Sequence, residues 1–167
     1  MNIVIVGAGE VGYNLAKVLS REDYDITVID NNPDKCVRAK NSLDAKVIEG
    51  DGASQRLLQK IDLKEIDYLL ALTRIDEVNL VSSYIAKKLG VKKVICRLRN
   101  TEYNHSIALV KPDDFKIDHV VFPEKAAQKE IENIIRNKSA IDIHELKADQ
   151  LSLLGVLIEP SSPLIGR

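Results

Sequence analysis

Short runs rich in apolar residues alternate along the chain with longer segments in which apolar residues recur every three or four positions. A run of consecutive apolar residues without polar interruption is typical of a strand buried on both faces of a parallel sheet. The clearest example is Ile3-Val-Ile-Val6. On this pattern, strands are predicted at residues 3–6, 26–29, 46–48, 68–72, 94–97 and 117–122.

The segments between these strands carry the periodicity and the end signals of helices. Asn32 followed by Pro33 is a typical helix start, and Gly90 is a typical helix stop. Helices are predicted at residues 10–21, from residue 33 onward, and at 54–60, 77–89, 102–110 and 124–137. Strands that alternate with helices predict a Rossmann-type α/β fold, with a doubly wound parallel six-stranded sheet in the order 3-2-1-4-5-6.

The pattern changes after the last of these helices. Residues 140–146 and 151–158 have the character of two antiparallel strands rather than of a further strand–helix unit. We therefore expect one domain over residues 1–138. Residues 139–167 are expected to be a C-terminal β stub, the beginning of a truncated second domain.

Composition narrows the classes of function. The 24 Lys and Arg residues nearly balance the 25 Asp and Glu residues, so the chain lacks the basic charge that holds nucleic acid. Aromatic residues make up only 4% of the chain, too few to provide stacking platforms for single strands. We expect no nucleic-acid partner.

The cysteines and the apolar segments of the sequence indicate where in the cell the protein is expected. Cys36 and Cys96 form no metal-binding or redox motif, which favours free thiols in a reducing compartment. The first predicted strand begins at Asn2, so no signal peptide is expected. No apolar run approaches the roughly 20 residues that span a bilayer. The sequence thus predicts a cytoplasmic protein that does not itself insert into the membrane.

A glycine-rich segment, Gly7-Ala-Gly9-Glu-Val-Gly12, lies between the first predicted strand and the first predicted helix. In that context G-x-G-x-x-G is the fingerprint of a loop that binds the pyrophosphate of a nucleotide. Gly7 permits the tight turn, Gly9 lets the backbone approach the phosphates, and Gly12 lets the helix pack closely against the strand. The helix N-terminus adds unpaired N–H groups and a partial positive charge.

Asp30 ends the second predicted strand, 18 residues after Gly12. This is close to the spacing of roughly 20 residues at which an acidic side chain binds the ribose of a dinucleotide. The carboxylate can accept hydrogen bonds from both ribose hydroxyls of the adenosine half. Its charge also repels a 2′-phosphate, so NADP is disfavoured.

Further polar residues at the same edge of the sheet each have two interpretations. Asp51 can accept a hydrogen bond from the adenine amino group, or it can cap the helix that follows. The Thr73 hydroxyl can meet ribose or phosphate, or it can serve the start of the next helix. Arg97 and Arg99, on one face of the fifth strand, can reach a phosphate or a partner subunit, or can lie at a solvated strand end. The residues alone leave these alternatives open.

No catalytic residues are apparent in the sequence. A dehydrogenase needs a second region that brings substrate to the nicotinamide, and an acid or base to manage the proton. No loop is long enough to form a substrate lid, no Ser/His or Cys/His arrangement is apparent, and the histidines lack metal-site spacing. We therefore expect a sensor with no catalytic residues and no metal site. An NAD-dependent oxidoreductase fragment that lacks its substrate domain is the alternative.

From Met1 to about Asn137 the chain closely resembles the TrkA N-terminal domain, also called the KTN or RCK domain, of potassium uptake systems and channels. Residues 154–167 are similar to the first strand and turn of the family's second module, the TrkA-C domain. The resemblance to the N-terminal domain rests on residues 6–12, 27–30, 49–54, 71–79, 97–100 and 117–124.

The resemblance implies a regulatory subunit without enzymatic activity that senses NAD or NADH, with ADP or ATP also possible. It implies a homodimer or higher homo-oligomer on the inner face of the cell membrane, held there by a membrane potassium-translocating subunit of the TrkH/KtrB-like type. Nucleotide occupancy would then reach that partner as a conformational change. The nucleotide-binding residues that follow are Gly7, Gly9, Glu10, Val11, Gly12, Asp30, Asn31, Asp51, Gly52, Thr73 and Arg97.

Glu10 favours one ligand over another within this resemblance. Family members that respond to ATP often carry Arg at the matching position, where it neutralises a terminal phosphate. A carboxylate at Glu10 is expected to repel a triphosphate tail, which favours NAD(H) over ATP and leaves ADP open.

Overall fold

The computed structural model describes residues 1–136, 140–146 and 151–156. These residues divide between Pro123 and Glu124 into two compact units. The strands are β1 (Asn2–Val6), β2 (Asp25–Asp30), β3 (Lys46–Glu49), β4 (Tyr68–Ala71), β5 (Lys93–Arg97), β6 (His119–Val121), β7 (Ala140–Leu146) and β8 (Leu151–Val156). The α-helices are α1 (Glu10–Leu19), α2 (Pro33–Ser42), α3 (Gln55–Gln59), α4 (Asp76–Lys88) and α5 (Pro123–Arg136), and the 3₁₀ turns are η1 (Leu63–Glu65), η2 (Thr101–Asn104) and η3 (Pro112–Phe115).

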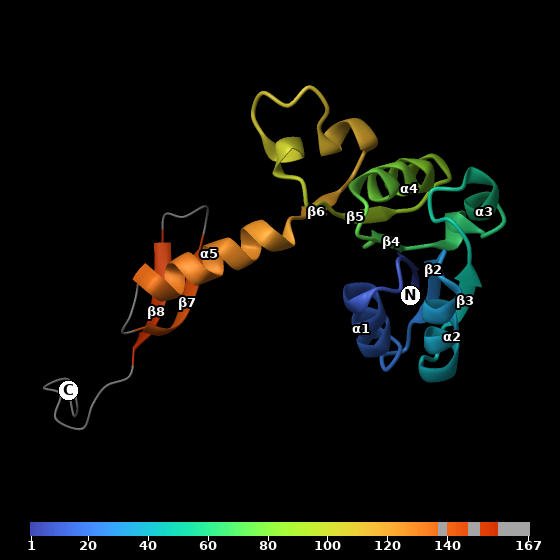
Figure 1. Ribbon diagram of the computed structural model, residues 1–167, viewed down its shortest axis with the longest axis horizontal. Helices are drawn as coiled ribbons and strands as arrows, with labels where there is room; N and C mark the ends of the chain where they lie inside the picture. The colour runs from blue at the N-terminus through green and yellow to red at the C-terminus, as the bar shows by residue number, and fades with distance from the viewer. Residues whose placement is uncertain (137–139, 147–150, 157–167) are drawn as a thin grey trace, which may run out of the picture. The chain divides into compact units, whose positions relative to one another are not determined.

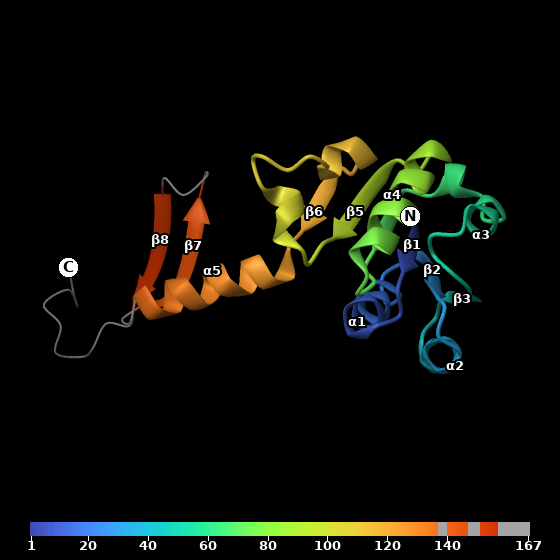
Figure 2. The ribbon, with the colours of Figure 1, turned by 45° about the horizontal axis from the view of Figure 1, so that its top comes forward.

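The first unit contains the predicted doubly wound sheet. Its six strands are all parallel and lie in the order β3-β2-β1-β4-β5-β6, which confirms the predicted topology. Figures 1 and 2 show α1 and α2 on one face of this sheet and α3 and α4 on the other. The order reverses between β1 and β4, so the carboxyl ends of these two central strands flank the topological switch point.

Alternate residues of the central strand enter separate halves of the core. Ile3 and Ile5 pack with Ala16 of α1, whereas Val4 and Val6 belong to the cluster on the side of α4. None of the four β1 residues is more than 3% exposed. A strand covered on both faces has no solvent-facing positions, which is why its sequence is continuously apolar.

Two of the predicted helix ends have the expected local chemistry. The Asn32 side chain accepts a hydrogen bond from the Lys35 amide at 3.0 Å, and Pro33 is the first residue of α2. At the end of α4, Gly90 has a φ of +101°. The amides of Gly90 and Val91 donate to the carbonyls of Lys87 and Ala86, which is the Schellman arrangement.

The segment between β5 and β6 differs from the prediction. A helix was expected at residues 102–110, but the chain forms the short turn η2 and then irregular turns before η3. The Asn100 side chain accepts a hydrogen bond from the Glu102 amide at 2.9 Å, and the later bonds, such as that from the His105 amide to the Glu102 carbonyl, span only three residues. The predicted strand at 117–122 is also shorter, because only His119–Val121 pair with β5.

The second unit contains α5, apart from its first residue Pro123, and the antiparallel pair of β7 and β8. The predicted antiparallel strands at 140–146 and 151–158 are therefore present as far as Val156. Residues 157–158, the rest of the segment similar to TrkA-C, and the predicted boundary between residues 138 and 139 lie outside the described residues. Among the residues described, none of the helices has the length and hydropathy that crossing a membrane requires.

Asp118, just before β6, ties that strand to β5 and α4. Its Oδ2 accepts a hydrogen bond from the Val94 amide at 2.6 Å and lies 2.7 Å from the Lys87 Nζ. Partial burial raises the pKa of this carboxyl, but the Lys87 ammonium and the Val94 amide outweigh burial, so the net pKa lies below its ordinary value.

Asp118→Asn is expected to lower the free energy of unfolding at pH 7 by about 1 kcal/mol. A carboxyl whose pKa is lowered by folding contributes stability above its unfolded pKa and loses that contribution as the pH falls through its folded pKa. The difference between variant and unaltered chain should therefore shrink below about pH 4. Urea unfolding followed by circular dichroism from pH 7 to pH 3 measures it, and a pH-independent difference would contradict the electrostatic explanation.

Candidate functional site

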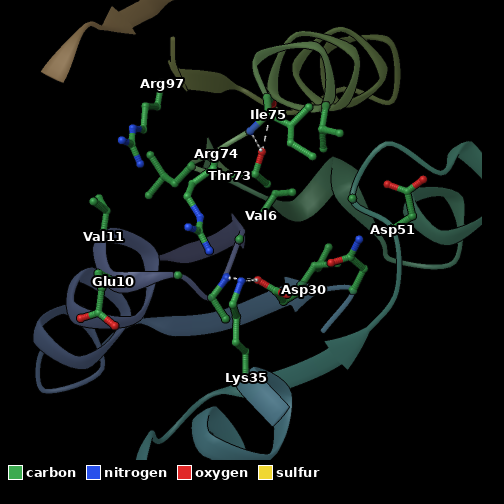
Figure 3. A pocket seen from close by; sticks show the side chains of 18 of the residues that line it. Val6, Glu10, Val11, Asp30, Lys35, Asp51, Thr73, Arg74, Ile75 and Arg97 are labelled. Carbon is green, nitrogen blue, oxygen red and sulfur yellow. Dashed lines mark hydrogen bonds and ion pairs between the residues drawn. The ribbon is translucent and has the colours of Figure 1, made fainter. Parts of the chain in front are cut away.

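A cavity of about 750 Å³ lies at the carboxyl ends of β1 to β5 (Figure 3). This is within the range of small-molecule and cofactor sites, and the carboxyl edge at the switch point is where doubly wound sheets bind ligands. Every nucleotide-binding residue expected from the sequence lines this cavity except Gly12. Its lining comprises Val6–Val11, Ile29–Asn31, Asp34, Lys35, Arg38, Gly50–Gly52, Leu72–Ile75, Val78 and Arg97.

The three glycines of the loop after β1 have different structural requirements. Gly7 has a φ of +106°, and a Cβ there would lie 3.0 Å from the Thr73 amide nitrogen, so the loop presses against the backbone that follows β4. A Cβ on Gly12 would collide with the Gly7 carbonyl oxygen, so the lack of a side chain at this position lets α1 pack closely on β1. At Gly9 a Cβ would meet no atom within 4 Å. Gly9 therefore leaves open space above the N-terminus of α1 without being required by the fold.

Gly9→Val is expected to preserve folding and weaken nucleotide binding at least tenfold. The φ of Gly9 is −68°, an angle that any residue adopts, and its added side chain would fill the space above the first amides of α1, where phosphates are expected from the sequence. Gly12→Ala, in contrast, should lower the melting temperature because its methyl group collides with backbone. Thermal unfolding and calorimetric titration of both variants separate the two effects, and equal destabilisation by both would refute the distinction.

Asp30, at the end of β2, is 7% exposed and holds the glycine loop against α2. Its Oδ2 accepts a hydrogen bond from the Ala8 amide at 2.7 Å, and its Oδ1 accepts one from the Asn32 amide at 2.9 Å. The Lys35 Nζ lies 3.6 Å from Oδ2. Each carboxylate oxygen can accept more than one hydrogen bond, so these contacts leave acceptor capacity for ribose hydroxyls at the cavity wall.

Glu10 does not place an uncompensated negative charge in the cavity. Its Oε1 lies 3.4 Å from the Arg38 Nη1, and the Arg38 guanidinium also lies 4.1 Å above the Tyr13 ring. Figure 3 shows the Glu10 carboxylate turned away from Thr73 and Arg97. The expected repulsion of a triphosphate tail by Glu10 is therefore offset by Arg38, a residue of α2 that had no predicted role.

Asp51 forms a local turn and does not cap α3. Its Oδ1 accepts a hydrogen bond from the Ala53 amide at 2.9 Å, whereas the cap of α3 is the Ser54 hydroxyl. The capping interpretation of Asp51 is thus wrong, and its exposed carboxylate lines the cavity on the side of β3. Gly52 follows it, and a Cβ at that position would collide with the Val6 side chain.

Thr73 serves the start of α4 through a network centred on Asn79, which is fully buried. The Asn79 Oδ1 accepts hydrogen bonds from the Thr73 amide at 2.9 Å and the Thr73 hydroxyl at 2.7 Å. The Asn79 Nδ2 donates to the carbonyls of Thr73 at 3.0 Å and Arg97 at 2.8 Å. One buried amide therefore satisfies all its hydrogen-bonding capacity and joins the ends of β4 and β5 beside the cavity.

Asp76, one turn earlier on α4, completes this connection. Its carboxylate accepts hydrogen bonds from the Arg99 amide at 3.0 Å and the Asn100 amide at 2.7 Å. Arg99 is exposed and does not line the cavity, whereas Arg97 does. Asp76 and Asn79, both buried, thus fix the backbone on both sides of Leu98 and so position Arg97.

Neither thiol has the chemistry of a nucleophile or a metal ligand. Cys36 and Cys96 are both free and buried, which confirms the predicted free thiols. Burial raises the pKa of Cys96 to about 12, and burial together with the Asp30 charge raises the pKa of Cys36. Both therefore stay protonated at neutral pH. In the described part of the chain no three His, Cys, Asp or Glu residues are grouped as metal ligands.

Comparison with known proteins places this chain in a family. The TrkA-N domain model matches residues 3–123. The Trk system potassium uptake protein TrkA homolog 2 of Methanosarcina mazei is 35% identical over 174 residues, which cover 100% of this chain and 38% of the relative. The corresponding homolog of Methanothermobacter thermautotrophicus is 32% identical and is covered over 74% of its length by 100% of this chain. The chain thus spans less than half the length of the first relative.

Similarity of structure agrees with the sequence relationship. The GsuK channel bound to NAD superposes with a TM-score of 0.67 at 14% identity, over 87% of this chain and 25% of the channel chain. At this identity the likeness shows the shared fold alone. The match of the family model over most of the chain identifies it: this chain belongs to the TrkA-N domain family.

Proposed function

We propose that this chain is the nucleotide-binding regulatory part of a potassium uptake system and that its ligand is NAD or NADH. The observation that carries the proposal is the cavity itself, in which Asp30 and the glycine loop lie together at the switch point of the sheet. The named relatives are potassium uptake proteins, and one structural neighbour is a channel bound to NAD.

The extent of the cavity favours a dinucleotide. Asp30 and Asp51 line it beyond β2 and β3, where the adenosine half would lie. The glycine loop lines its centre, and Thr73, Ile75 and Arg97 continue it beyond β4 and β5. A mononucleotide would fill only the first part, whereas the second half of a dinucleotide would reach β4 and β5.

The proposed mode of action is conformational rather than catalytic. A ligand over Thr73 and Arg97 would touch the backbone that Asn79 and Asp76 connect to the segment after β5. Occupancy would thereby alter how this domain meets a second copy of itself and a membrane potassium-translocating subunit. On this proposal the chain works in the cytoplasm, at the inner face of the membrane, as a homodimer or larger assembly.

Calorimetric titration of the chain with NAD, NADH, NADP, ADP and ATP tests the ligand assignment. Tightest binding of NAD or NADH would support it, and NADP should bind more weakly because Asp30 repels a 2′-phosphate. Tightest binding of ATP would mean that the site responds to the concentration of ATP instead of that of NAD or NADH. If none of the five binds, the nucleotide-sensing proposal is wrong.

A further inference from the structure

The loop after β4 carries an arginine beside the glycine loop. Arg74 follows Thr73, whose backbone lies within 3.1 Å of the position that a Cβ on Gly7 would occupy. The Arg74 side chain is exposed and lines the cavity. Figure 3 shows it pointing from the loop into the cavity, toward the ends of β1 and β2.

The other cations of the cavity are already engaged within the chain. Lys35 pairs with Asp30, and Arg38 contacts both Glu10 and the Tyr13 ring. Arg97 also has an interaction within the chain. Arg74, in contrast, makes no hydrogen bond, ion pair or ring contact with any residue that the structure describes. It is therefore the cavity cation whose charge is available to an incoming anion.

The glycine loop supplies only part of what a diphosphate needs. The first amides of α1 have no intrahelical acceptor, and Gly9 leaves the space above them open. These amides suit the phosphate attached to the adenosine half. A second phosphate would be directed from β1 toward β4, where a planar guanidinium can form paired hydrogen bonds with its oxygens.

We propose that Arg74 binds the second phosphate of the nucleotide from the side opposite the glycine loop. The site then selects adenine nucleotides that carry at least two linked phosphates, and AMP is a poor ligand. This inference rests on the proposed function, since it assigns the ligand class of the same cavity.

Titration of the unaltered chain, Arg74→Gln and Arg74→Lys with NAD, ADP and AMP tests the proposal. Arg21→Gln is the matched control, because Arg21 is exposed just beyond the C-terminal end of α1 and does not line the cavity. We expect Arg74→Gln to weaken NAD and ADP binding about 10- to 100-fold, the effect of losing hydrogen bonds to a charged group. AMP binding should change less than about threefold, and Arg74→Lys should retain part of the affinity because it keeps the charge.

The outcome is read from the ratio of ADP to AMP affinity. A ratio that falls in Arg74→Gln and is unchanged in Arg21→Gln supports the assignment. If Arg74→Gln has the same ratio of ADP to AMP affinity as the unaltered chain, the proposed role of Arg74 is wrong, but the nucleotide site itself stands. Failure of the unaltered chain to bind NAD or ADP overturns the site itself, and the assignment of Arg74 with it. Thermal unfolding without ligand confirms that the variants are folded.

Discussion

Asn79→Ala is expected to lower the free energy of unfolding by about 3 kcal/mol. The substitution removes the acceptor of the Thr73 amide and the donor to the carbonyls of Thr73 and Arg97. The Thr73 hydroxyl loses one acceptor and keeps the Ile75 carbonyl as another. Backbone groups that lose their partners in a buried setting retain their desolvation penalty, so the loss exceeds the net value of ordinary hydrogen bonds. Urea unfolding followed by circular dichroism measures the change.

Asn41→Ala is the matched control for this experiment. Asn41 is also helical, but it is exposed on α2, and its substitution should change stability by no more than about 0.5 kcal/mol. Similar small losses in both variants would show that the Asn79 network contributes nothing beyond helix propensity. A large loss at Asn79 alone would establish it as the link between β4 and β5.

On the proposed function, Asp30→Ala should weaken NAD binding about 100-fold, because the variant would lack two charge-assisted hydrogen bonds to the ribose. The same change should shift the preference between NAD and NADP toward NADP. Asp30 no longer repels a 2′-phosphate, and Lys35, which pairs with Asp30 at 3.6 Å, becomes available to attract it. Calorimetric titration with both cofactors measures the two affinities and their ratio.

Asp34→Ala distinguishes this role from a general effect of charge. Asp34 lines the same cavity and lies in the first turn of α2, but it is exposed. Its removal takes away the same charge and should alter NAD affinity less than about threefold. If Asp34→Ala and Asp30→Ala weakened NAD binding equally, Asp30 would have no specific place at the ribose.

The order of the sheet could be predicted because its signals are local. Each strand of the first unit is a short apolar run, and the connection rules for parallel strands then leave few arrangements. The helix predicted at residues 102–110 was wrong because the turn begun by Asn100 ends at once. The backbone of His105 is extended, with a ψ of 144°, so η2 stops at Asn104, and Pro112 begins the separate turn η3.

The site was harder to predict because its contacts join distant segments. The glycine loop and Asp30 carry a recognised spacing, whereas the pairing of Glu10 with Arg38 joins residues 28 positions apart on different helices. Spacing alone gives no sign of that pairing, so the charge of Glu10 was overestimated. The role of Asn79 was missed for a related reason. Its side chain bonds to groups of Thr73 and Arg97, and these contacts can be identified only when β4 and β5 are placed beside α4.

The cavity is assembled from the ends of β1 to β5, and this has a consequence for the lifetime of the protein. A chain in which one of these strands has left the sheet lacks part of the lining, so a ligand of the cavity binds the intact sheet alone. At a ligand concentration one hundred times the dissociation constant, such linkage adds about 2.7 kcal/mol to stability. The fraction of chains that are unfolded, and therefore accessible to proteases, falls about a hundredfold as a result. The cellular supply of such a ligand would then influence the abundance of this protein.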